Sequence, residues 1–324
     1  MRYGWLIGML TMGLAGVGCS DSNDAAPPTG GGGGNNGMNT AAGGDTGSGS
    51  DNGGCTPQVG VEPGPDWVCI TDVNGGVVDE NGGPLPDILM TVCGPGGCEP
   101  DTTDDSGSFA IDVGFPILTS DYSLIPHSRE YDYFVYYFPF AADAAGPVID
   151  MGPLTLLSYP PTTDRLVVKT DEAGAPAQTA TNGDVTIDVP AGTRVNLDFE
   201  DVLLGEEGKR FLSRRVDPSA QDAFIDPSFG AVALYALAPF DAGFDLDSAP
   251  GTPAKVQLTF DNTAGLAADT PVQFYQQGSF IVGDLQTAVF HPVATGQVSA
   301  DGTTIAMDPG EGLEFLTWVA IAPR

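Results

Sequence analysis

Short apolar runs with a period of two constrain the fold of this chain more than any other feature. In these runs Val, Ile, Leu and Phe alternate with polar or small residues, as in strands that bury one face; clear examples lie at 109–113, 185–189 and 256–260. Turn signals that contain glycine punctuate the sequence at 74–76, 81–83, 106–107, 182–183 and 301–302. Only 197–215 favours a helix, and Gly205 and Gly208 interrupt it, because glycine weakens a helix. The pattern predicts an all-β fold.

The region that carries this pattern is too long for one small sandwich. It runs from Asp66 to Arg324, whereas a sandwich of the immunoglobulin type takes about 100 residues. The proline-rich stretch SYPPTT at 158–163 is the natural boundary,. We therefore predict two antiparallel β-sandwich modules in tandem, over 55–160 and 161–324.

A glycine-rich segment at 20–54 precedes the modules. It has 12 Gly in 35 residues and contains no aromatic residue, Val, Ile or Leu. Such a segment cannot bury enough apolar surface to offset its chain entropy. We predict a disordered tether, which spans on the order of 30 Å if it follows the statistics of Gly-rich coils.

The pattern of residues 1–19 is typical of an export signal. Arg2 precedes an apolar stretch, and small residues precede Cys19; the stretch is shorter than the ~20 residues of a spanning helix. Together with Ser20, these features resemble the lipobox of bacterial lipoproteins, although Gly16 stands where that family usually has leucine. The resemblance implies cleavage before Cys19, lipid on that cysteine, and membrane attachment in the bacterial cell envelope, at the outer membrane. The alternative is an ordinary signal peptide with an incidental cysteine.

The cysteine count agrees with export. Of the 5 Cys, lipid on Cys19 leaves four, which can form two disulfides. Proximity in the sequence suggests Cys55 with Cys69 and Cys93 with Cys98, although four cysteines allow three connectivities. An oxidising compartment favours disulfides over zinc thiolates, and neither pair has the two-residue spacer of a zinc site.

The first module has a recognisable sequence. A strand that ends at Val77 and Val78 precedes an NGGPLPD turn at 81–87, a strand at 88–92, a TTDDSGSF hairpin at 102–109 and a closing IDMGPLTL at 149–156. These motifs resemble the carboxypeptidase regulatory-like domain, a transthyretin-like β-sandwich, over roughly 66–157. Gly82, Gly83 and Gly107 fall where tight turns favour glycine. The resemblance implies a spacer or partner-binding module without catalytic residues.

The second module resembles a different group of β modules. NGDVTIDVPAGTRV at 182–195 is similar to the opening of ZU5-type modules, and 254–275 is similar to lipoprotein variants of such modules. The resemblance covers 165–322 and implies a structural or interaction role. Thr317 and Trp318 stand where relatives often carry His, so no site residue carries over.

Charge excludes nucleic acid as a partner. With 43 acidic and 11 basic residues, the formal net charge is -32, the opposite of the basic footprint that nucleic-acid binding needs. The sequence has no GxSxG, phosphate-loop or HExxH motif,. We therefore predict that the protein is not an enzyme and has neither a cofactor nor a metal.

Two parts of the sequence resemble metal sites. HSRE at 127–130 resembles the zinc motif of metallocarboxypeptidases, with His127, Glu130 and His291 as ligands, but a β pattern follows directly where such an enzyme needs an α/β domain. The acidic turns at 72–81 and 101–107 carry the oxygen ligands that calcium prefers. We favour solvated turns, because Asp and Asn serve turn geometry.

The run YDYFVYYFPF at 131–140 places aromatic residues on both faces of a predicted strand. One face would pack in a core, and the other could offer a platform for sugar rings or a protein partner; the candidate ligand-binding residues are Tyr131, Tyr133, Tyr136 and Tyr137. We favour burial of both faces, between the sheets and against the second module, because aromatic strands usually pack.

Four of the 11 basic residues fall within seven positions: Lys209, Arg210, Arg214 and Arg215. They could bind an anion, but we favour local pairing with Glu206 and Glu207. As a whole, the sequence predicts a non-catalytic, lipid-anchored envelope protein for structural display or for interaction with a cell-surface protein. Binding of surface polysaccharide through the 131–140 aromatics is the alternative.

Overall fold

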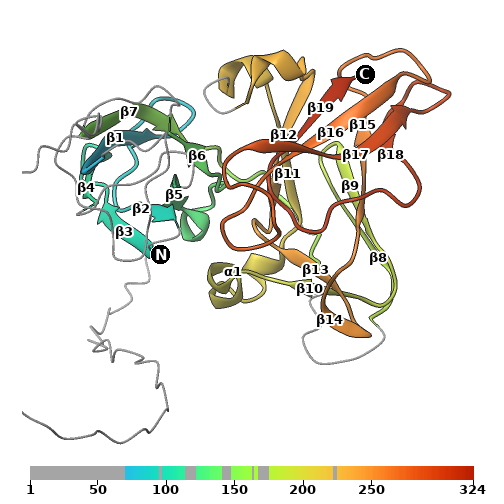
Figure 1. Cartoon of the computed structure of the whole chain (residues 1–324), viewed down its shortest axis with the longest axis horizontal. Coiled ribbons are helices and arrows are strands. Elements are labelled where there is room, and N and C mark those ends of the chain that lie inside the picture. The colour runs from blue at the N-terminus through green and yellow to red at the C-terminus, as the bar shows by residue number, and fades with distance from the viewer. Residues whose placement is uncertain are drawn as a thin grey trace, which may run out of the picture. The chain divides into compact units, whose positions relative to one another are not determined.

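The computed structural model describes residues 70–94, 97–113, 122–140, 147–162, 164–166, 175–221 and 225–324. These segments are built mainly of strands (Figure 1), which confirms the predicted all-β class. Within them the one α-helix is α1 (Phe199–Leu203), and 3-10 helices lie at Arg129–Tyr131, Glu207–Lys209, Pro218–Gln221 and Pro227–Phe229. No helix of the described segments has the length and apolar character that a membrane span requires. All the described segments belong to one compact unit.

Residues 72–155 form two small sheets, with strand orders β4-β1-β7 and β3-β2-β5-β6. The strands are β1 (Asp72–Val78), β2 (Leu89–Gly94), β3 (Gly97–Thr102), β4 (Ser108–Asp112), β5 (Ser123–His127), β6 (Phe138–Pro139) and β7 (Val148–Thr155). All pairs are antiparallel except β1 with β7. Buried residues of both sheets, such as Val73 and Val92, belong to one core cluster. The two sheets therefore pack as a sandwich.

Two segments predicted as a turn and a hairpin of this sandwich have other structures. The glycines at 75–76 lie inside β1, where the pairing with β7 shifts register; a Cβ on Gly75 would lie 2.7 Å from the Phe109 ring. The predicted hairpin at 102–109 is a crossing between the sheets, because β3 pairs with β2 and β4 pairs with β1. A glycine signal alone does not distinguish close packing, a hairpin and a change of sheet.

Residues 178–323 build a second all-β region around one sheet of nine antiparallel strands, in the order β11-β12-β19-β16-β17-β18-β15-β9-β8. These strands are β8 (Gln178–Asn182), β9 (Val185–Val189), β11 (Leu212–Val216), β12 (Ala233–Ala238), β15 (Gln257–Asp261), β16 (Pro271–Gln277), β17 (Phe290–Val298), β18 (Thr304–Met307) and β19 (Val319–Pro323). As the turn signals at 182–183 and 301–302 predict, hairpins join β8 to β9 and β17 to β18.

The outer strands of this sheet meet, so that the sheet nearly closes into a barrel. At the end of β8, the side-chain oxygen of Asn182 accepts a hydrogen bond from the backbone N–H of Ser213 in β11 at 2.8 Å, and the Ser213 hydroxyl donates to the Asn182 carbonyl. A smaller sheet of order β10-β13-β14 adds to this region; its strands are β10 (Thr193–Asn196), β13 (Gly243–Leu246) and β14 (Ala249–Pro253). Near closure leaves the long sheet with little free edge.

Two longer segments also differ from the sequence-based prediction. The predicted strand at 131–140 is mostly irregular, and only Phe138–Pro139 pairs, as β6. The predicted helical stretch at 197–215 is reduced to α1, which ends just before Gly205, and β11 begins at Leu212. Gly205 has φ +63°, a conformation that commonly ends helices.

We predict that replacing Gly107 with Ala destabilises the first sandwich more than the same change at Gly82. Both glycines have a positive φ, +76° and +78°, but a Cβ on Gly107 would lie 2.5 Å from the Val77 carbonyl oxygen, whereas a Cβ on Gly82 has no neighbour within 4 Å. Gly82→Ala should lower the free energy of unfolding by ~1–2 kcal/mol, the strain of a left-handed residue, and Gly107→Ala by more. Urea unfolding of both variants measures the difference; equal losses would contradict the role of the close contact.

Candidate functional site

The aromatic segment 131–140 packs inside the protein. Tyr136 and Tyr137 expose 1% and 0% of their surface. Tyr133 is half-buried, and Tyr131, at 41%, is the exposed one of the four candidate tyrosines. The four-tyrosine platform is therefore not formed, because two of its rings have no free face. Burial on both sides, the favoured interpretation, holds for Phe134–Tyr137, whereas Tyr131 is exposed and Tyr133 is half-buried.

Side chains of the second β region hold the backbone of this segment in place. The Gln277 amide oxygen accepts a hydrogen bond from the Tyr137 N–H at 3.2 Å, and its nitrogen donates to the Tyr137 carbonyl at 2.8 Å. The Trp318 indole nitrogen donates to the Val135 carbonyl at 2.9 Å. Trp318 also packs on Tyr136, with ring centroids 4.9 Å apart. These bonds satisfy buried backbone groups that have no strand partner.

A buried charged cluster lies beside this contact. Arg129, 4% exposed, comes from the first β region, and its guanidinium pairs with the carboxylate of Asp198 in the second. The carboxylates of Glu200 and Asp201 lie 3.5 and 3.8 Å from Arg129 Nη1. Asp241, also buried, accepts a hydrogen bond from the Tyr137 hydroxyl at 2.6 Å. One buried guanidinium thus faces several carboxylates. The cluster would therefore carry a net negative charge away from water if every carboxylate were ionised.

The protonation of this cluster responds to burial. Burial raises the pKa of Asp201 to about 7, with Asp198 adding to the rise and Arg129 opposing it. Burial likewise raises the pKa of Asp241 to about 6, against the hydrogen bond from Tyr137. For Arg129, burial acts to lower the pKa, but the surrounding carboxylates outweigh it and the pKa is raised. Near neutral pH the arginine therefore stays charged while part of the acid is protonated.

The residues of the zinc hypothesis are not brought together. His127 Nδ1 contacts the Glu200 carboxylate, and its Nε2 lies 2.9 Å from the Thr91 hydroxyl. His291 Nε2 lies 3.2 Å from the Gln286 carbonyl. Glu130 sits in the 3-10 helix that follows His127. The described part of the chain has no group of three His, Cys, Asp or Glu side chains placed to hold a metal ion.

The carboxylates of the acidic turns cap backbone groups. Asp79 Oδ1 accepts hydrogen bonds from the N–H groups of Asn81 and Gly83, both at 2.8 Å. Asp104 Oδ1 accepts from those of Ser106 and Ser108, at 2.8 and 3.0 Å. Backbone hydrogen bonds lead the causes that lower the pKa of Asp79, and the Ser106 hydroxyl leads those that lower the pKa of Asp104. These aspartates serve turn geometry, as we expected.

The basic cluster is paired as predicted, and it also reaches the first β region. Lys209 pairs with Glu206 at 2.6 Å, and Arg210 pairs with Glu207 at 3.3 Å. Arg210 also bonds Asp132 at 2.6 Å, and Arg214 pairs with the carboxylate of Glu80. Most positive charges of the basic cluster therefore pair with carboxylates of this chain.

The predicted disulfide between Cys93 and Cys98 is present. It joins β2 to β3 at a position where the two cysteines face each other across the pair. Cys19, Cys55 and Cys69 lie outside the described residues.

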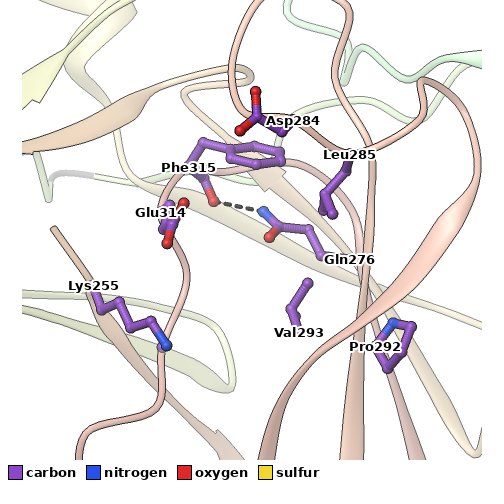
Figure 2. A pocket seen from close by; sticks show the side chains of 9 residues that line it. Lys255, Gln276, Asp284, Leu285, Pro292, Val293, Glu314 and Phe315 are labelled. Carbon is purple, nitrogen blue, oxygen red and sulfur yellow. Dashed lines mark hydrogen bonds between the residues drawn. The ribbon is translucent and has the colours of Figure 1, made fainter. Parts of the chain in front are cut away.

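A hollow of about 260 Å³ opens in the second β region (Figure 2). Its lining combines charged, polar and apolar side chains: Lys255, Gln276, Asp284, Leu285, Pro292, Val293, Glu314 and Phe315, with Gly312. Gln276 is 1% exposed, and its Nε2 donates to the Phe315 carbonyl at 2.6 Å. Figure 2 shows the amide between Phe315 and the apolar side chains.

Three local features build this hollow. The pairing of β16 with β17 shifts register between Phe274 and Tyr275, so Val293 has no partner across the pair; such bulges re-aim side chains. β18 pairs only with Gly296–Val298 of β17, which leaves that side of β17 open near Val293. The loop after β16 then packs on Phe315, because a Cβ on Gly283 would lie 2.5 Å from that ring. Asp284 follows immediately and is thereby placed at the hollow.

Several of these residues were not predicted as functional. Gln277, Trp318 and Arg129 hold the two β regions together, and Gln276 lines the hollow. One available signal concerned Gln276: in β16, Val272 and Phe274 point inward, and Gln276 falls on the same phase,. A polar residue at an inward position is a candidate for a specific hydrogen-bonding role.

No protein-family model matches this chain, and no curated protein matches it. Among solved structures, a protein described as a "putative carbohydrate binding protein" from Bacteroides uniformis ATCC 8492 is 8% identical, with a TM-score of 0.18, over 79% of this chain and 80% of that one. The Bacillus anthracis TIE protein is 12% identical, with a TM-score of 0.23, over 74% of this chain and 44% of that one. This chain thus aligns with less than half of the TIE chain. At these TM-scores neither likeness bears on fold or function.

We predict that mild acidification stabilises the protein through Asp201 and Asp241. Their pKa values in the folded state, about 7 and 6, lie above the ordinary 3.8. Between these limits the folded protein holds protons that the unfolded chain has released, so these groups lower stability as pH rises from about 4 to 7. The melting temperature should therefore fall from about pH 5 to about pH 8.

Asp201→Asn tests the assignment because it removes one of the two titrating groups and a buried charge. The variant should melt higher than the wild type at about pH 8, and its melting temperature should depend less on pH. Asp198→Asn is the contrasting control: it removes the carboxylate paired with Arg129 and should lower the melting temperature at every pH. An unchanged pH slope in Asp201→Asn would refute the assignment.

Proposed function

We propose that this protein is a non-catalytic, lipid-anchored protein of the bacterial cell envelope, at the outer membrane, that presents its β modules as one rigid body for structural display or protein interaction. The observation that carries the proposal is the buried contact of segment 134–137 with Gln277 and Trp318. Modules that move independently on a flexible linker would not bury such a contact. Modules fixed to each other keep their exposed surfaces in one relative orientation, and a fixed orientation suits display.

The anchor and the tether come from the sequence. Lipid on Cys19 and the 20–54 tether would hold the modules away from the bilayer. A net charge of -32 repels anionic head groups. The tether and the charge therefore act in the same direction.

The alternative, polysaccharide binding through the 131–140 aromatics, loses support from the burial of Tyr136 and Tyr137. Ring stacking needs an exposed face, and this segment offers one mainly at Tyr131. If the protein binds a saccharide, the hollow beside Gln276 is the better place.

We predict that Cys19→Ser abolishes lipidation, because the serine has no thiol to carry the lipid. The full-length protein, expressed in bacteria fed an alkyne-tagged palmitate, should carry the label and enter the detergent phase on phase separation. Cys19→Ser should do neither, and Ser20→Ala, which changes the adjacent residue, should behave as the wild type. Label that persists in Cys19→Ser would contradict the anchor.

We predict that the two β regions unfold in a single calorimetric transition. Gln277→Leu leaves the N–H and C=O of Tyr137 without partners and should lower stability by about 2–4 kcal/mol. Gln273→Leu removes an amide of the same strand that bonds only within the second region, and should change stability less. Two separate transitions in the wild type would exclude the rigid body while leaving the anchor intact.

A further inference from the structure

The hollow beside Gln276 contains a hydrogen-bond acceptor that nothing in the described residues satisfies. Gln276 Nε2 donates to the Phe315 carbonyl at 2.6 Å. A carbonyl oxygen only accepts hydrogen bonds, so the amide nitrogen must face Phe315 and the amide oxygen must face the other way. Figure 2 shows that oxygen turned toward the open space between Glu314 and Val293. No donor among the described residues reaches it.

This arrangement suits a binding site, because the amide is held in one orientation and its oxygen has no donor from the described part of the chain. Gln276 is 1% exposed, yet its oxygen is not among the fully buried unpaired side-chain atoms of the described residues, so it is open to the hollow. A donor brought by a ligand would complete the site. The amide is also pre-oriented, because its other end is fixed to the backbone.

The charges around the hollow define the donor. Asp284 and Glu314 add carboxylate oxygens to the lining, and Lys255 is the one cation there. Lys255 lies 3.7 Å from Glu311 at the border of the hollow. Three acceptor groups and a net negative lining favour a cationic donor and disfavour an anionic ligand. A primary ammonium, with three N–H donors, matches them.

The remaining walls define what carries the ammonium. Leu285, Pro292 and Val293 give the hollow an apolar side, which suits the carbon face of a sugar ring. Lys255 is a donor, so it can bond only to an acceptor, such as a ring hydroxyl. A simple alkylamine would offer Lys255 no acceptor beyond Glu311, whereas one amino sugar offers both an ammonium and hydroxyl acceptors. The volume, about 260 Å³, is of the size of one such residue.

We propose that this hollow binds a saccharide residue that carries a free amino group. The ammonium lies among Gln276 Oε1 and the carboxylates of Asp284 and Glu314, the hydroxyls face Lys255, and the ring lies on the apolar wall. This site goes beyond the proposed display function and does not depend on the anchor. It would give the displayed body a ligand among cationic surface polysaccharides.

Isothermal titration of the purified full chain tests the site with glucosamine oligomers. We expect saturable binding, and at least tenfold weaker binding of the N-acetylated oligomers, which have lost the ammonium. No binding of glucosamine oligomers would overturn the proposal. So would equal binding of the acetylated oligomers, or equal binding of 1,5-diaminopentane, which has no ring.

Matched variants separate the site from the general attraction of an acidic protein for cations. The double variant Asp284→Asn/Glu314→Gln should weaken binding of glucosamine oligomers at least tenfold. Glu99→Gln/Asp105→Asn removes the same charge from the first sandwich and should leave binding unchanged. Equal weakening by both double variants would overturn the proposal, because the attraction would then be unspecific. These substitutions lie on half-buried or exposed side chains, so folding should be retained, and the unfolding midpoint checks it.

Discussion

The contact between the two β regions depends above all on a glutamine that takes the place of a strand partner. Segment 134–137 is buried but has no neighbour in a sheet, and Gln277 supplies both a donor and an acceptor to the backbone of Tyr137. Burial of unpaired peptide groups would be strongly unfavourable. Because Gln277 ends β16 and Trp318 precedes β19, the barrel-like sheet determines where the first sandwich can dock. Tyr137 in turn bonds Asp241, which connects the contact to the charged cluster.

Electrostatics in this protein are organised around scarcity of positive charge. With 11 basic residues against 43 acidic ones, some of the described cations serve more than one carboxylate. Arg129 faces several carboxylates, and Arg210 bonds two. Aspartates in turns are stabilised by backbone N–H groups instead. At Asp201 and Asp241, burial raises the pKa enough that protonation offsets part of the cost of burying the carboxylate.

Local patterns predicted the parts of the fold that local physics decides. The alternation at 185–189 coincides with β9, and the NG signal at 182–183 joins β8 to β9. The run 131–140 shows no alternation, so its conformation depends on partners about 140 to 180 residues away, such as Gln277 and Trp318. The glycines at 75–76 were predicted to form a turn, because composition does not reveal that the Phe109 ring leaves no room for a Cβ at Gly75. The alternative of a sugar platform loses support at Tyr136 and Tyr137 for the same reason, because distant packing partners decide which rings are exposed. The hollow was not predicted, although the inward phase of Gln276 in β16 was readable.

The position of β19 in the barrel-like sheet has a consequence for the order of events during folding. β19, the last strand in chain order, lies between β12 and β16, and Trp318 directly precedes it. Until residues 318–323 are in place, β12 has no strand that connects it to β16, β11 meets the other strands only at the contact of Ser213 with Asn182, and Val135 lacks its hydrogen-bond donor. Completion of the barrel and docking of the sandwich therefore wait for the same short segment. Such long-range pairing slows folding.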